Sequence, residues 1–396
     1  MPRPSPFYSR TSKLSLSQSW KDWAGYYAAK TYDTSHDSEY MALRHSAGLI
    51  DVSPLFKYDI TGPDAAAFLS RVTVKNLDRL KPGRVTYLCW CDDDGKVVDD
   101  GTVSRLDENY FRVTAAEPSV GWFDPLRRGY QVDIEDVTEK LGALSLQGPT
   151  SRDLLRELVD FDIDQLRFFA IQACQLGGIG VWLSRTGYTG DLGYEIWVET
   201  GSAEKLWDRL AKTGQSFGLR PVGLDAMDVT RIEAGFIMNG VDYYSAHHCL
   251  IEGRKSSPFE LGLGWTVQLD REPFVGQAAL RREKEAGARK LMVGLEVDWE
   301  SLEAIFESYG LPAELPSAAW RDGKPVYDTG KSWIGQATSG VWSPTLKKNL
   351  SLAQLNAEQA AIGNEVRFDL MAEYHRHLVP ATVVKTPFFN PARKRE

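Results

Sequence analysis

Apolar residues recur in the first part of the chain in short blocks with the period of a helix or of a strand. Residues 38–50 carry apolar positions at helical spacing and run past Gly48, which predicts a helix with a glycine C-cap. The run 56–61 is typical of a strand and ends at a Gly-Pro pair. Asp64 then stands where an N-cap is expected, ahead of a helix over 65–71.

A β-hairpin is predicted next, because two apolar-rich runs, 85–91 and 97–105, flank an Asp-Gly turn. A third strand follows at 110–114. A similar series of elements returns later in the chain. We expect it as a strand at 143–146, a helix at 151–159, strands at 173–176, 179–184 and 194–198, and a helix at 203–213. Two sets of hairpin plus helix predict an α+β fold rather than a doubly wound parallel sheet.

The pattern changes beyond residue 287, where short apolar runs are separated by turn residues. We expect strands at 290–297, 325–327, 334–341, 350–355, 366–370 and 381–385. This spacing predicts a β-sandwich or β-barrel domain. A charged, alanine-rich helix at 276–288 would link the two parts. We therefore divide the chain into residues 1–285 and 286–396.

Composition places the chain among ordinary globular proteins, with 43% hydrophobic and 25% charged residues in a length of 396. The net charge of -8 disfavours a nucleic-acid or anionic-membrane binder, and no apolar run would span a bilayer. Cys89 and Cys91 would share one face of a strand, where we expect them to pack as small hydrophobic residues. We expect a reducing, cytoplasmic setting and include the acid-free residues 1–21 in the mature fold.

Two adjacent acids, Asp99 and Asp100, follow the hairpin turn, and in a strand their side chains point to opposite faces. Acids are depleted in strand interiors. A buried carboxylate is costly unless it is paired or hydrogen-bonded, and is therefore often retained for function. From spacing alone, a functional carboxylate and a pair of ordinary hairpin acids are equally good interpretations.

A glycine-rich segment, Arg185–Glu195, has glycine at every third position between two predicted strands. Dinucleotide-binding and phosphate-binding loops must open a helix, so neither is predicted here. A hairpin whose backbone can approach a ligand fits better. Tyr188 would supply an aromatic face, and Glu195 is a second candidate for a buried carboxylate.

Asp228 and Arg231 lie three residues apart on a predicted helix, a spacing that allows an ion pair. Spacing alone favours a surface salt bridge. The pair His247-His248 is expected in a loop. No metal-ligand motif and no serine nucleophile elbow is present, so we predict no metal site.

Seven segments, in order along nearly the whole chain, resemble the family of the glycine-cleavage T-protein (aminomethyltransferase). They are GLIDVS at 48–53, GKVVDD at 95–100, LSLQGP at 144–149, RTGYTGDLGYE at 185–195, RIEAG at 231–235, TSGVWSPTLKKN at 338–349 and VVKTPF at 383–388. The resemblance implies a three-lobed cloverleaf. Residues 1–285 would form two α+β, ferredoxin-like lobes that bind folate, and 286–396 a C-terminal β-barrel.

The resemblance also implies residue roles. Asp100 falls on the family's catalytic aspartate, and Glu195 on the carboxylate that holds the pterin of tetrahydrofolate. The other expected folate contacts are Tyr188, Asp99, Arg231 and Thr114. Chemistry agrees, because one carboxylate can accept from the paired N–H and amino donors of a pterin, and a flat ring stacks on aromatic side chains.

The sequence departs from the T-protein pattern in three places. Pro54 replaces a histidine, Thr114 an asparagine and Met227 an arginine. Family members that demethylate small O-, S- or N-methylated compounds differ from the T-protein in similar places. We therefore expect a tetrahydrofolate-dependent demethylase that acts on a small methylated substrate, with or without a separate dehydrogenase subunit.

Two alternatives stay open. The first is aminomethyl transfer from a lipoyl carrier protein, the T-protein reaction. The second is a non-enzymatic, folate-binding iron–sulfur assembly factor, whose signature K-G-C-Y-x-G-Q is matched at 271–277 only by Gly276-Gln277, without the cysteine. Trp90, Trp122 and Tyr243 could line a site for a cationic methyl donor, although the sequence favours a place in the core for each.

Overall fold

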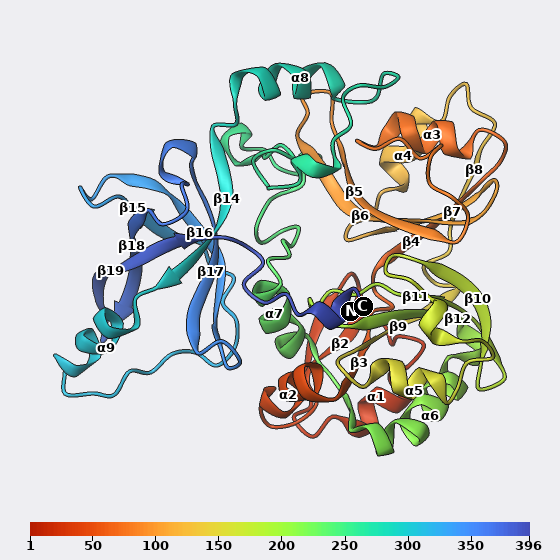
Figure 1. The fold of residues 1–396 in the computed structure, drawn as a ribbon, viewed down its shortest axis with the longest axis horizontal. Helices are drawn as coiled ribbons and strands as arrows, with labels where there is room; N and C mark the ends of the chain where they lie inside the picture. The colour runs from red at the N-terminus through yellow and green to blue at the C-terminus, as the bar shows by residue number, and fades with distance from the viewer.

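Three lobes meet at a common centre in the computed structural model, which describes residues 1–396 (Figure 1). Two lobes are built on open sheets of six and five strands, and the third is a closed six-stranded barrel. The predicted combination of two α+β lobes and a C-terminal barrel is confirmed. No helix has both the length and the apolar character needed to cross a bilayer.

The first lobe is built on a sheet with the strand order β10-β11-β12-β9-β3-β13. Its strands are β3 (Ala47–Asp51), β9 (Leu141–Gln147), β10 (Ile171–Leu176), β11 (Ile179–Ser184), β12 (Gly193–Glu199) and β13 (Leu219–Pro221). Its helices are α1 (Tyr8–Leu14), α2 (Asp37–His45), α5 (Ser151–Arg156) and α6 (Ala203–Gly214), and a ribbon of β1 (Ser19–Trp23) and β2 (Tyr26–Thr31) adjoins them. Every residue of the central strand β9 is buried, as expected for an apolar run covered on both faces.

The second lobe has the strand order β5-β6-β7-β4-β8. Its strands are β4 (Phe56–Thr61), β5 (Arg84–Cys91), β6 (Val97–Asp107), β7 (Tyr110–Ala115) and β8 (Asp133–Asp136), and its helices are α3 (Ala65–Val72) and α4 (Val120–Leu126). Gly101 on β6 has to be glycine, because a Cβ atom there would collide with the carbonyl oxygen of Thr114 on β7. The two strands therefore lie unusually close just after Asp100.

The third lobe is a barrel in which β14 pairs with both β17 and β19, so the sheet has no free edge. Its strands are β14 (Lys290–Val297), β15 (Lys324–Tyr327), β16 (Trp333–Ser343), β17 (Lys348–Asn356), β18 (Glu365–Ala372) and β19 (His375–Val384), with helix α9 (Trp299–Glu307). The linking helix α8 spans Gln277–Ala286. We propose a boundary at residues 285–286, because α8 ends there and the first barrel strand follows.

One local prediction was wrong, and a second was right in position only. The helix predicted over 38–50 ends at His45, and Ala47–Asp51 forms strand β3 between β9 and β13. Its first four residues are all buried, so pairing in the sheet prevails over the helical spacing. Asp64 stands at the N-cap position of α3 as predicted, but its side chain makes no capping hydrogen bond, because Oδ2 accepts from the backbone N–H of Gln131 at 2.7 Å instead.

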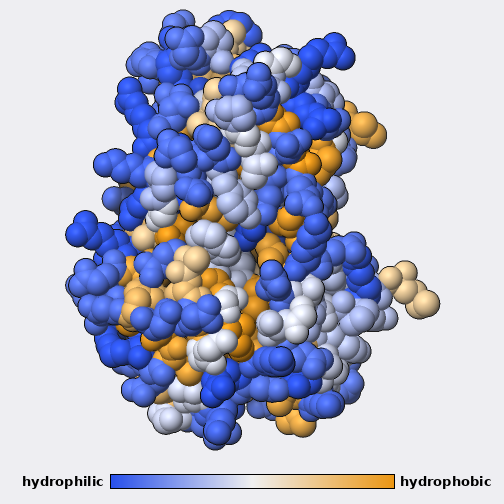
Figure 2. Space-filling model, turned by 90° about the vertical axis from the view of Figure 1, so that its right-hand side faces the viewer, coloured by the Kyte–Doolittle hydropathy of each residue, from blue (hydrophilic) through white to orange (hydrophobic).

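Helix α7 (Leu224–Glu233) lies at the centre of the molecule, and the C-terminal segment returns from the barrel to the same region (Figure 1). All ten residues of α7 are buried, charged ones included. A side view of the two α+β lobes shows a largely hydrophilic surface, with hydrophobic residues at the level where the lobes meet (Figure 2). The junction of the lobes is therefore where buried polar groups have to find partners within the protein.

Candidate functional site

Asp100 lies on β6 of the predicted hairpin, opposite Cys89 on β5, and is half-buried. Two tyrosine hydroxyls donate to its carboxylate. Tyr87 donates to Oδ2 at 2.7 Å, and Tyr243 donates to Oδ1 from the segment that follows α7. Tyr87 also stacks on the exposed ring of Trp265, with 6.1 Å between ring centroids. Asp100 is thus fixed by phenols and keeps acceptor positions free.

Asp99 is fully buried and is held differently. Its Oδ2 accepts from the backbone N–H groups of Ala116 and Glu117, both at 3.0 Å. Its Oδ1 accepts from the side chain of Asn239 and from the backbone of Asp100, both at 2.9 Å. Asp99 therefore anchors the turn after β7 and the segment after α7 around the half-buried neighbour.

Burial raises the pKa of both Asp99 and Asp100, because each carboxylate loses hydration beside another acid. No arginine, lysine or histidine forms an ion pair with either of them. The hairpin therefore presents an acid that holds a proton more readily than an ordinary aspartate.

Glu195 lies on β12 in the first lobe and is also half-buried. Its Oε2 accepts from the hydroxyl of Thr186, which is its only side-chain partner. Burial raises the pKa of Glu195, and the nearby ammonium of Lys57 opposes the rise. Lys57 donates to the carbonyl oxygens of Ser53 and Leu55, at 2.8 and 2.6 Å. The free side of the Glu195 carboxylate can accept further donors.

Tyr188 and Thr114 lie near these acids. The Tyr188 hydroxyl donates to the carbonyl of Ile237 at 2.6 Å, and its ring stacks on Phe236 at 5.5 Å between centroids. Burial raises the pKa of Tyr188, the guanidinium of Arg231 opposes the rise, and the carboxylate of Asp100 adds to it. The Thr114 hydroxyl is 2.7 Å from that of Thr102, beside Asp100 on β6.

Arg231 is completely buried, so the predicted surface salt bridge was wrong in its location, although its pairing with Asp228 at 2.8 Å was right. Arg231 also pairs with Asp242 at 2.5 Å, and Asp242 accepts from Thr338 and Ser339 of the barrel. This network joins α7 to β16 and to the segment that carries Tyr243. One guanidinium nitrogen of Arg231, Nη2, has no protein partner.

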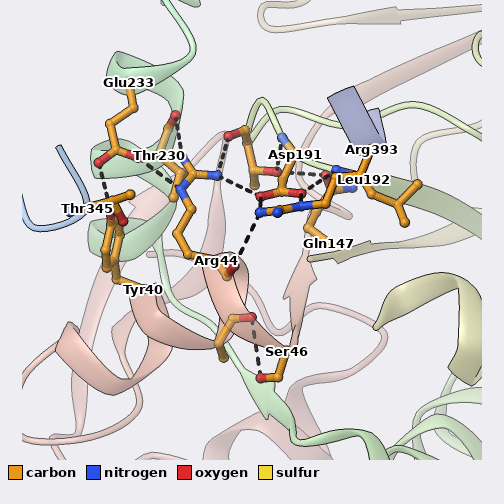
Figure 3. Close-up of polar contacts among 12 residues, drawn as sticks. Tyr40, Arg44, Ser46, Gln147, Asp191, Leu192, Thr230, Glu233, Thr345 and Arg393 are labelled. Atoms are coloured by element: carbon orange, nitrogen blue, oxygen red, sulfur yellow. Dashed lines mark hydrogen bonds and ion pairs between the residues drawn. The ribbon is translucent and has the colours of Figure 1, made fainter. Parts of the chain in front are cut away.

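A second buried network fixes the glycine-rich loop (Figure 3). Arg44 on α2 pairs with Glu233 of α7 at 2.5 Å and donates to the carbonyl of Thr189 at 2.9 Å. Asp191 of the same loop is bound by Arg393 of the C-terminal segment at 2.7 and 2.8 Å. The loop between Tyr188 and Glu195 is therefore held from two sides, through contacts that lie far apart in the sequence.

The predicted residues thus lie around the junction of the two α+β lobes, whereas three further partners were not assigned as site residues. The sequence predicts Tyr87 only as part of a strand, gives no role to Asn239, and offers Tyr243 only as a lining of the donor site. The one signal for Tyr87 was its place on the partner strand of the hairpin. Nothing local points to Asn239, which reaches Asp99 across 140 residues of sequence.

These residues fit the pterin of tetrahydrofolate. The free side of Glu195 suits a donor pair, the Tyr188 ring offers an aromatic face, and the Asn239 carbonyl oxygen is buried without a protein partner. No group of three or more histidine, cysteine, aspartate or glutamate side chains is arranged to hold a metal ion. The site has the features of one that binds an organic group.

Comparisons with known proteins agree with this geometry. Residues 11–271 match the model of the GCVT N-terminal domain, and residues 309–390 that of the glycine cleavage T-protein C-terminal barrel domain. An aminomethyltransferase of Caldanaerobacter subterraneus subsp. tengcongensis is 34% identical, over 87% of this chain and 86% of its own.

A trimethylamine-oxide aldolase of Ruegeria pomeroyi is 31% identical over the whole of this chain, which corresponds to 48% of that protein. The crystal structure of glycine cleavage system aminomethyltransferase T from Bartonella henselae superimposes with a TM-score of 0.83 at 24% identity, covering 98% of this chain and 99% of that one. The chain therefore belongs to the glycine-cleavage T-protein (aminomethyltransferase) family of folate-dependent one-carbon transferases.

Proposed function

We propose that the chain transfers a methyl group from a small O-, S- or N-methylated substrate to tetrahydrofolate, with Asp100 as the group that takes up the proton. Bound tetrahydrofolate would supply the nitrogen that accepts the carbon. The observation that carries the proposal is the state of Asp100, a half-buried acid with a raised pKa and only hydroxyl partners. Such a carboxylate is suited to general base catalysis near neutral pH.

The roles of the other residues follow from their contacts. Glu195 would accept from the donor pair of the pterin, and Tyr188 would face its ring. As the methyl group moves, the bond between carbon and the donor heteroatom breaks with its electron pair left on the heteroatom. Asp100 receives the proton released by the accepting nitrogen, so the reaction is redox-neutral. Folate contacts of Asp99, Arg231 and Thr114 are proposed on the resemblance, and Arg231 would act through its unpaired Nη2.

Two departures from the T-protein pattern favour a small donor. Pro54 is buried where the pattern has a histidine. Met227 is 5% exposed and belongs to the hydrophobic core where the pattern has an arginine. The chain thus lacks two polar groups on the proposed donor and folate-tail sides. An apolar replacement suits a compact methylated substrate better than a charged carrier arm.

Aminomethyl transfer from a lipoyl carrier protein is the second candidate, because relatives such as the Caldanaerobacter protein are named aminomethyltransferases. Under the first proposal, a separate dehydrogenase subunit is the candidate partner, as the resemblance implies. Under the second, the partner is the carrier protein. The iron–sulfur assembly role has no support from the aligned stretch, where Phe274 is buried under Arg271 and no cysteine is present.

The product distinguishes the two reactions. Purified protein is incubated with tetrahydrofolate and a panel of methylated ethers, thioethers, sulfonium compounds and amines, and separately with an aminomethylated lipoyl carrier protein. We expect 5-methyl-tetrahydrofolate from at least one small donor, detected by mass spectrometry, and none with Asp100→Asn. Formation of 5,10-methylene-tetrahydrofolate from the carrier alone would refute the first proposal in favour of the second.

A further inference from the structure

The two acids of the hairpin differ in the kind of group that binds them. Asp99 accepts from four N–H groups, which belong to the backbone of Asp100, Ala116 and Glu117 and to the side chain of Asn239. An N–H group can donate but cannot accept. Burial raises the pKa of Asp99 to about 7, but protonation of Asp99 would set a buried O–H against these four donors and weaken their bonds, which opposes uptake of a proton in a buried site.

Asp100 is bound by hydroxyls instead, and a hydroxyl can accept as well as donate. Tyr87 donates to Oδ2 and Tyr243 to Oδ1. The Tyr243 oxygen also lies 3.3 Å from Oδ1 of Asp99. If Asp100 gains a proton on Oδ1, the Tyr243 oxygen can accept that bond and its own hydrogen can turn to Asp99. Both states of Asp100 then keep a full set of hydrogen bonds.

We propose that Tyr243 is a positioning residue whose hydroxyl turns from Asp100 to Asp99 when Asp100 takes up a proton, while Asp99 stays ionised. This role rests on the proposed function, which assigns to Asp100 the proton released during transfer. No covalent bond of Tyr243 changes. Burial and the adjacent carboxylates raise the pKa of Tyr243 well above its usual value, so the phenol keeps its hydrogen throughout.

Asp99 is the second acid within reach of the Tyr243 hydroxyl, which lies between Asp99 and Asp100. Other titratable groups around Asp100 are Tyr87 and Cys89 on β5, Tyr188 in the glycine-rich loop, and Asp242 after α7. The negative charge of Asp242 is balanced by its ion pair with Arg231. Asp99 has no such cation, so its charge is available to attract the Tyr243 hydrogen.

A titration of the carboxyl groups tests the proposal without turnover. Protein labelled with [4-13C]aspartate is followed by NMR from about pH 5 to pH 9, and the resonances are assigned with Asp100→Asn and Asp99→Asn. We expect the Asp100 resonance to titrate and that of Asp99 to stay at the ionised shift. Titration of Asp99 in place of Asp100 would overturn the proposal.

Two conservative variants separate the tyrosines. Tyr87→Phe removes a bond that Oδ2 accepts in both forms of Asp100 but more strongly in the ionised form, and should raise the midpoint by about one pH unit. Tyr243→Phe removes a bond donated to the ionised form and a bond accepted from the protonated form, so the two losses offset each other and the midpoint should move less. An equal rise in the two variants would contradict a turning hydroxyl. Because each variant loses one oxygen atom only, either can be read if the other folds poorly.

Turnover adds a readout with a matched control. Tyr243→Phe should lower kcat about tenfold or more at every pH, with the KM for folate unchanged, because Asp100 loses its orientation in both states. Tyr110→Phe is the control, since Tyr110 also donates to a buried aspartate, Asp59, at 2.6 Å, and lies at the end of β7 away from Thr114. We expect its kcat to stay within about twofold of wild type.

Equal losses of kcat in the two variants would assign Tyr243 a merely structural role. If no donor supports transfer by the wild-type protein, the proposed function fails. The carboxyl titration still decides whether Asp100 or Asp99 takes the proton, so the two failures can be told apart.

Discussion

Replacing Glu195 by glutamine should weaken folate binding by about 10- to 150-fold, since a hydrogen bond to a charged group contributes roughly 1.5–3 kcal/mol. The structure supports the upper part of this range. Thr186 donates to one oxygen of the Glu195 carboxylate, and the other acceptor positions of this carboxylate have no protein donor. Burial raises the pKa of Glu195. Ligand donors would therefore satisfy a group that is costly to leave ionised. Glutamine keeps the shape but presents an NH2 group to those donors.

The assay is isothermal titration calorimetry with 5-formyl-tetrahydrofolate, which has the same pterin and a blocked accepting nitrogen. Glu199→Gln is the matched control, because Glu199 is on the same strand at its exposed end. We expect its Kd to stay within about twofold of wild type, as for an exposed charge. A Glu195→Gln protein with wild-type affinity, correctly folded by circular dichroism, would refute the assignment of Glu195 to the pterin.

Two further predictions concern other charged groups. Asp100→Asn should lower turnover by about a hundredfold or more, because an amide cannot take the proton, with the Kd for 5-formyl-tetrahydrofolate nearly unchanged; full activity would exclude Asp100 as the base. Burial lowers the pKa of Lys57 to about 7, so above that pH the unfolded chain binds a proton that the folded chain does not. The free energy of unfolding of the wild-type protein, relative to that of Lys57→Met, should therefore rise by up to about 1.4 kcal/mol per pH unit. Urea unfolding of both proteins at about pH 7.5 and pH 9 measures this difference. A difference that does not change with pH would contradict the prediction.

The sequence predicted those elements whose cause is local. The Asp-Gly turn lies within the hairpin that it forms, and the barrel strands alternate with their own turn residues, so both were found. The prediction of a helix beyond His45 was wrong because the same run of apolar residues can form either a fully buried strand or a helix. Only the pairing of β3 with β9 and β13, contributed by residues far along the chain, decides between them.

The residues of the candidate site come from the resemblance and not from the spacing. The hairpin geometry could not choose between Asp99 and Asp100, and it could not supply Tyr243, which lies 143 residues away in the sequence. Helix α7 shows a related limit. Its spacing indicated the pair of Arg231 and Asp228, but a helix buried on every side has no polar face from which its burial could be read.

The partners of the buried acids separate structural roles from the proposed functional ones. Fully buried carboxylates such as Asp191, Glu233 and Asp242 each have an arginine within ion-pair distance, and removal of either partner would leave a buried charge. Asp100 and Glu195 have no cation and accept only from hydroxyls. The protein neutralises several of its buried acids with arginine, but Asp100 and Glu195 are half-buried and have no arginine partner. These two acids can therefore exchange a proton or accept hydrogen bonds from a ligand. The lack of a cation distinguishes them from Asp191, Glu233 and Asp242, and the lack of side-chain or distant backbone N–H donors distinguishes them from Asp99.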